Sequence, residues 1–332
     1  MAVFLIYKAR HYTGGVATIA AVFPACMVMN AALKGLCLTL VTILMWASLP
    51  LVLQQVLPVV SPRTVVACRF AAAALVLGLF LRARRRLPAP SLLLQNRWLV
   101  LIGMLGLVGN FWLFSTSLLY LSAAASQVLA QLSPFILLAA GVVVLKEPLR
   151  ANQIAGAVIL MAGILLFFNR ELPQLFAGGA SQQMIGITLS LLGCFSWAAY
   201  GLMQKMLLRR FTAPQVLFVF YCGCALFAAP FADWAELGNM NGYQALCLLY
   251  CCINTPIAYG AFAEALNHWE VGKVSTTITL VPLFTIVFAE LAHWLLPAKF
   301  AAPDLNLLAG FGAALVVCGA VISVLNRRMQ RK

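Results

Sequence analysis

Long apolar runs, separated by short polar gaps, follow one another from residue 31 to residue 325 of the 332-residue sequence. Each run extends over about 20 residues, the length that a helix needs to cross a hydrocarbon core ~30 Å thick. None of the gaps is long enough to hold a separate soluble domain. The pattern predicts an all-α membrane protein with ten transmembrane helices, near residues 32–53, 62–81, 98–118, 124–145, 152–168, 184–206, 214–231, 243–265, 273–296 and 306–325.

The second five runs repeat features of the first five in the same order. Gly35 precedes Trp46 by eleven residues, and Gly186 precedes Trp197 by the same interval. A shift of 148 positions superposes Phe114 and Pro134 on Phe262 and Pro282. A shift of 156 positions superposes Gly156 and Gly163 on Gly312 and Gly319. Because five is an odd number of crossings, the second copy enters the bilayer from the opposite side. The sequence therefore predicts two five-helix inverted repeats, a construction typical of secondary transporters.

The repeats define the domain organisation that we expect. The first copy occupies residues 31–170 and the second copy residues 184–325. Residues 1–30 contain an apolar run that is too short to span, so we expect an N-terminal extension there. Residues 326–332 form a basic tail.

Composition excludes a water-soluble protein. Hydrophobic residues make up 64% of the sequence and charged residues only 9%, and the mean hydropathy is +0.98. Most of the basic residues behind the net charge of +14 lie in alternate gaps, at 82–97, 146–150, 205–210 and 327–332. The positive-inside rule places these gaps and both termini in the cytoplasm. We therefore expect the lipid bilayer, and no nucleic acid, as a partner. The cysteines lack CxxC spacing and suggest packing residues, so no metal site is predicted.

Several short motifs mark the first copy, and the second copy keeps fewer of them. The motifs are Cys68-Arg69-Phe70, residues 118–124, Leu132-Ser133-Pro134, Lys146-Glu147-Pro148-Leu149 and Gly156-Ala157 with Gly163, then Gly186 with Trp197-Ala198, Pro282, and Gly312 with Gly319. In this order, over residues 31–325, the chain resembles the drug/metabolite transporter superfamily, of the kind built from two EamA domains. The resemblance implies a ten-helix bundle with a central cavity that exports or exchanges small metabolites such as amino acids.

The second copy departs from the family pattern near its fourth helix. Glu147 follows Pro134 by thirteen residues, but no acid stands thirteen residues after Pro282. Glu290 comes eight residues after that proline instead, and the loop beyond it is longer.

Polar side chains within the apolar runs recur on corresponding helix faces of the two copies. Such side chains are expensive in lipid, so we expect them to face a shared cavity. The predicted substrate-binding residues are Trp46, Gln127, Gln131, Trp197, Tyr200 and Thr279. Alternatives remain open at this point, since the tryptophans can serve as helix-contact aromatics and the glutamines can bond between helices.

Two acids within the spans are candidates for proton coupling. A carboxylate in hydrocarbon favours its protonated form, so it can take up a proton from water and release it when its surroundings change. Glu264 lies near the cytoplasmic end of the eighth helix and Glu290 toward the outer half of the ninth, one turn before His293. Either acid can equally form a hydrogen bond to a neighbouring helix or pair with Lys273 or Arg69.

Together these features predict a secondary transporter, in the cytoplasmic (inner) membrane of a bacterium, that exports small polar metabolites by alternating access. We expect a small-molecule substrate, a monomer or homodimer, no cofactor, and no enzymatic activity. The competing hypotheses are a membrane-embedded enzyme and a non-transporting receptor or subunit. An enzyme would need a convergent nucleophile and base, and a receptor has no need of inverted repeats.

Overall fold

The computed structural model describes residues 31–146, 150–170, 182–268, 274, 277–302 and 305–324. The predicted extension (1–30) and basic tail (326–332) lie outside these residues. Every element within them is helical, which confirms the predicted all-α class. The helices are α1 (Ala31–Val56), α2 (Pro62–Ala83), α3 (Pro90–Gln95), α4 (Arg97–Ser117), α5 (Ala123–Ala130), α6 (Leu132–Leu145), α7 (Ala151–Phe167), α9 (Gln182–Leu207), α10 (Ala213–Ala228), α11 (Gly242–His268), α13 (Val281–Leu295) and α14 (Leu307–Val324), with two short 3-10 helices, η4 (Ala229–Phe231) and η5 (Trp234–Asn239).

Seven helical segments in the described residues are long and apolar enough to cross a membrane. These seven are Leu33–Val56, Pro62–Ala83, Arg97–Ser117, Ala123–Val144, Gln182–Leu207, Ala213–Phe231 and Gly242–Phe262. Three shorter apolar helices accompany them, at Ala151–Phe167, Val281–Leu295 and Leu307–Ser323. The outer surface is apolar as well, with Leu226 at 77% and Leu307 at 94% exposure. Lipid contact explains such exposure, and the chain is a membrane protein.

The segment predicted as one helix over 124–145 is divided at Gln131. This residue ends α5 and precedes α6. Pro134 lacks the N–H that would bond to the carbonyl of Ala130 in a continuous helix, which accounts for the division. Ser122 starts α5 as its N-cap, with its hydroxyl accepting the N–H of Ala125 at 3.2 Å.

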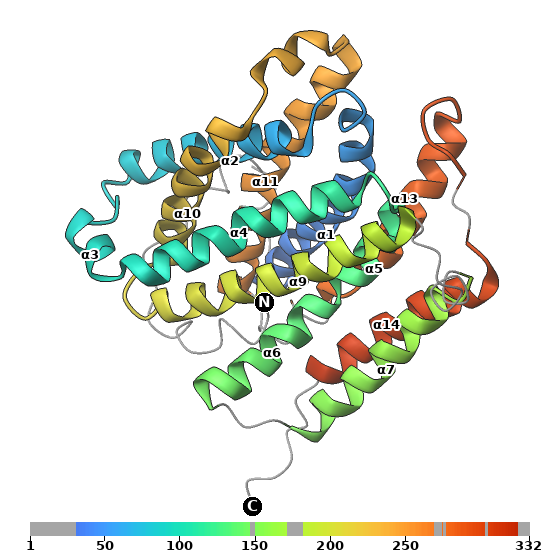
Figure 1. Cartoon of the computed structure of the whole chain (residues 1–332). Coiled ribbons are helices and arrows are strands. Elements are labelled where there is room, and N and C mark those ends of the chain that lie inside the picture. The colour runs from blue at the N-terminus through green and yellow to red at the C-terminus, as the bar shows by residue number, and fades with distance from the viewer. Residues whose placement is uncertain are drawn as a thin grey trace, which may run out of the picture.

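Helices from the two ends of the chain pack against each other in pairs. In Figure 1, α4 lies along α9, and the C-terminal α14 lies along α7. The same holds for α1 with α11 and for α2 with α10. The helix α13 packs against both α1 and α5, and α6 packs against α9. The core of the bundle therefore lies between the two halves of the sequence.

Glycines let the backbones of α7 and α14 approach closely. A Cβ atom added at Gly156 would lie 2.5 Å from the carbonyl oxygen of Gly319. One added at Gly163 would lie 2.6 Å from the backbone nitrogen of Val316. Small residues at helix contacts are a common device in membranes, where packing rather than water exclusion drives association.

Candidate functional site: a proline break in α1

The candidate site starts from a proline inside the first helix. Pro50 lies within α1 and has no backbone N–H. In a regular helix that N–H would bond to the carbonyl of Trp46, four residues earlier. The carbonyl of Trp46 is therefore left without its partner in the helix, at a depth where an unsatisfied polar group costs several kcal/mol in hydrocarbon.

Three other helices supply side-chain donors to the backbone carbonyls of α1 just before Pro50. Nε2 of Gln127, from α5, donates to the carbonyl oxygen of Trp46 at 2.9 Å. Nδ2 of Asn254, from α11, donates to that of Met45 at 2.7 Å. Oγ1 of Thr285, from α13, donates to that of Ala47 at 3.1 Å. Three successive carbonyls of α1 thus join it to α5, α11 and α13.

The ring of Trp46 packs into an aromatic group on α11. Its centroid lies 5.5 Å from that of Tyr259, edge to face, and 5.8 Å from that of Phe262. Two of the predicted substrate-binding residues, Trp46 and Gln127, are therefore in direct contact. That contact is a bond between helices, the alternative that the sequence left open for Gln127.

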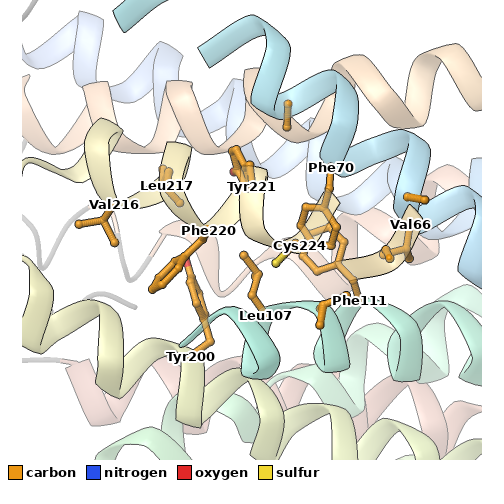
Figure 2. Close-up of a cluster of buried hydrophobic side chains, with 14 of the residues drawn as sticks. Val66, Phe70, Leu107, Phe111, Tyr200, Val216, Leu217, Phe220, Tyr221 and Cys224 are labelled. Carbon is orange, nitrogen blue, oxygen red and sulfur yellow. The ribbon is translucent and has the colours of Figure 1, made fainter. Parts of the chain in front are cut away.

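Two further predicted residues, Trp197 and Tyr200, lie together on α9. Their ring centroids are 6.3 Å apart. Tyr200 is 1% exposed and packs against Phe220 of α10 at 5.6 Å. Figure 2 shows Tyr200 and Phe220 in one buried cluster with Phe111. Trp197 and Tyr259 are both half-buried at the edge of this cluster. Through its contact with Trp46, Tyr259 connects the cluster to α1.

The two remaining predicted substrate residues are Gln131 and Thr279. Gln131 is half-buried at the break between α5 and α6. Thr279 is buried just before α13 and follows Ile278, which packs in the cluster around Trp46. The substrate role of all six residues stays a prediction.

The two predicted proton-coupling acids have different surroundings. Glu264 is half-buried near the end of α11, and its Oε1 lies 2.9 Å from Nε2 of His268, one turn on. Glu290 is exposed on α13. His293, one turn after Glu290, has its Nδ1 2.8 Å from the carbonyl oxygen of Phe300.

Sequence reasoning missed the two partners Asn254 and Thr285. The sequence did contain a signal. Pro50 implies that the carbonyl of Trp46 has no partner within the helix, and Asn254, in another apolar run, is a possible side-chain donor. The sequence does not say which helix lies beside the break, so the donors could not be assigned to it.

Comparison with known proteins adds to this geometry. The model of the EamA-like transporter family matches the chain twice, over residues 33–169 and 184–325. A Haemophilus influenzae protein named "Uncharacterized transporter" is 43% identical over 297 residues, which cover 90% of this chain and 96% of the relative. The Escherichia coli "Uncharacterized inner membrane transporter YhbE" is 41% identical, over 89% of this chain and 92% of its own length.

More distant proteins are similar to the chain over a comparable length. A Salmonella typhimurium protein named "Probable amino-acid metabolite efflux pump" is 24% identical, over 89% of this chain and 96% of its own. One solved crystal structure, 21% identical, aligns with a TM-score of 0.60 over 89% of this chain and 99% of that chain. With two matches of the family model and relatives above 40% identity, the chain belongs to the EamA-like transporter family.

Proposed function

We propose that this protein is a secondary transporter that exports small polar metabolites, such as amino acids or related compounds, across the bacterial inner membrane by alternating access. Ten spanning helices, arranged as two inverted five-helix repeats at residues 31–170 and 184–325, form the carrier. In this arrangement α1, α2, α4, α5–α6 and α7 correspond to α9, α10, α11, the α13 segment and α14.

The observation that carries the proposal is the symmetry of the helix pairs. Exchanging each helix for its counterpart turns the pair α1–α11 into α9–α4, and α1–α13 into α9–α6. It turns α2–α11 into α10–α4, and it maps α2–α10, α5–α13 and α7–α14 onto themselves. Every one of these pairs is in contact. A two-fold axis through the bundle accounts for this pattern, as expected for inverted repeats.

Alternating access requires two arrangements of such repeats around one substrate site. The proline inside α1 supports this, because carriers commonly place their sites at hydrophobic segments that contain proline or glycine. We place the substrate beside Trp46, Gln127, Gln131, Trp197, Tyr200 and Thr279, with Glu264 and Glu290 as the proton-coupling acids. Membership of a transporter family favours a carrier over a membrane-embedded enzyme, and the name of the Salmonella relative supports amino-acid metabolites as the first compounds to test.

Counterflow in liposomes tests the function. Purified protein is reconstituted in vesicles loaded with one unlabelled amino acid or derivative at a time, and uptake of the same labelled compound is followed. We expect saturable exchange of at least one compound, recovered chemically unchanged by mass spectrometry. Chemical conversion of the compound would favour an enzyme, and no exchange across a broad panel would contradict the proposal.

A further inference from the structure

A buried cation, Arg69, lies eight residues into α2 with no carboxylate facing it in the described part of the chain. The residue is 3% exposed. Its Nε donates to Oγ1 of Thr255 at 3.2 Å, and its guanidinium carbon lies 4.5 Å from the centre of the Phe111 ring. The titratable groups that act on it are the thiols and phenols of Cys251, Cys252, Tyr221 and Tyr259.

These contacts leave much of the guanidinium unsatisfied. Arginine carries five N–H donors in a planar fork, and its terminal nitrogens make no hydrogen bond to any described residue here. A charge taken out of water costs several kcal/mol unless it is paired and hydrogen-bonded. The hydroxyl of Thr255 and the stacked ring of Phe111 offset only part of this cost.

A second unsatisfied donor lies in the same region. The hydroxyl of Tyr221, on α10, is buried and has no hydrogen-bond partner among the described residues. The ring of Tyr221 lies 6.0 Å from that of Phe70, which in turn lies 4.6 Å from that of Phe111. Figure 2 shows these three rings in one cluster between α2, α4 and α10.

The position of the two donors follows from the repeat. Arg69 and Tyr221 stand at equivalent positions, 152 residues apart, in the same register as Pro62 and Pro214. Their helices, α2 and α10, pack against each other and are counterparts in the two halves. One copy therefore places an arginine, and the other a phenol, beside the two-fold axis. Such an asymmetric pair makes one anion site rather than two.

We propose that Arg69, together with the hydroxyl of Tyr221, binds the carboxylate of a small organic acid or amino acid that this protein carries. The inference deepens the proposed function and rests on it. A planar carboxylate matches the fork of a guanidinium through two parallel hydrogen bonds and balances its single charge. Tyr259 lies between this site and Trp46, so the remainder of the ligand extends along aromatic rings toward the break in α1.

Ligand-induced stabilisation of the full-length protein in lipid nanodiscs tests the site. The probes are a panel of L-amino acids and 2-oxo acids, the matching primary amides, and inorganic sulfate and phosphate. We expect at least one carboxylate to raise the unfolding midpoint while its amide does not. Arg69→Gln should weaken the apparent affinity for that carboxylate at least about tenfold, since hydrogen bonds to a charged group contribute about 1.5–3 kcal/mol.

Three more variants make the test specific. Arg69→Lys should retain part of the binding, and Tyr221→Phe should weaken it by about threefold to tenfold, since one neutral hydrogen bond contributes about 0.5–1.5 kcal/mol. Both keep the test independent of whether Arg69→Gln folds. Arg63→Gln, which removes an exposed arginine at the start of the same helix, should leave binding unchanged.

Three outcomes would overturn the inference. They are the absence of any carboxylate-specific stabilisation in the native protein, equal stabilisation by sulfate or phosphate, and unchanged carboxylate affinity in both Arg69→Gln and Tyr221→Phe. Liposome exchange separates this inference from the proposed function. If Arg69→Gln exchanges the carboxylate as fast as the native protein, the carrier stands and the anion site fails. If a carboxylate binds through Arg69 but nothing is exchanged, the site stands and the carrier fails.

Discussion

Pro50 changes the hydrogen bonding of α1 because proline has no backbone N–H. By withholding one N–H from α1 it frees the carbonyl of Trp46, and Gln127 satisfies that carbonyl from α5. Gln127 is only 8% exposed, so water cannot easily replace its amide. The bond between these helices is therefore a consequence of the proline, and the two positions should be energetically coupled.

A double-mutant cycle measures this coupling. Gln127→Leu leaves a buried carbonyl unpaired and should lower stability by about 1–3 kcal/mol. In a Pro50→Ala background the alanine supplies the missing backbone N–H, so the same substitution should have a smaller effect. Unfolding of the four proteins in detergent gives the coupling energy. Equal losses in both backgrounds would show that Gln127 acts independently of the break.

The acid Glu264 gives a second prediction for a single residue. Replacing it with glutamine keeps the shape of the side chain and removes its titrating charge. If Glu264 couples transport to protons, Glu264→Gln should flatten the dependence of exchange on the pH gradient across liposomes. Glu290→Gln, on the exposed face of α13, should have a smaller effect. A well-inserted Glu264→Gln protein with native rate and native pH dependence would assign the acid a structural role with His268.

Among the helices, α7 and α14 form the tightest described pair of backbones, because glycines occupy the contact on both sides. Gly156 faces Gly319, and Gly163 faces the backbone of Val316. A side chain added at Gly156 or Gly163 would push the two helices apart at that point. The pair should therefore move as one unit during transport.

Gly163→Ala tests this close contact. The added methyl group would lie 2.6 Å from a backbone atom that cannot rotate away. We expect destabilisation of about 1–3 kcal/mol, the usual range for overpacking. Gly310→Ala is the matched control on α14, because nothing lies within 4 Å of its added Cβ. Thermal unfolding in detergent compares the two variants, and equal midpoints would contradict a tight contact at Gly163.

Hydrophobic pattern was sufficient to predict where most helices run, because a bilayer imposes a fixed length on each apolar segment. It also placed Trp46 and Gln127 on polar faces that meet. It did not reveal the division at Gln131, since a proline near a helix start can also be accommodated without a break. The position of His293 in the sequence did not predict its partner either, because the contact with Phe300 depends on the conformation of the loop that follows α13.

On the scale of the whole molecule, the basic gaps predict an orientation that the packing alone does not fix. Leu87 is exposed in the arginine-rich gap after α2, and Gly238 is exposed in η5. The positive-inside rule places the first in the cytoplasm and the second outside.

Labelling of intact cells with a membrane-impermeant maleimide tests this orientation. In a cysteine-free background, Gly238→Cys should react from outside, whereas Leu87→Cys should react only after the membrane is permeabilised. Labelling of both positions from the same side would be incompatible with inverted repeats.

The pairing of helices from the first half of the chain with helices from the second half also has a consequence during synthesis. Gly163 of α7 is made long before its partner helix α14, and at 5–20 residues per second the ribosome needs about 10–30 s to reach it. During that interval the small-residue face of α7 lacks α14, the helix that it packs against most extensively. The first half of the chain is therefore in the membrane before the helices that it pairs with in the second half have been made.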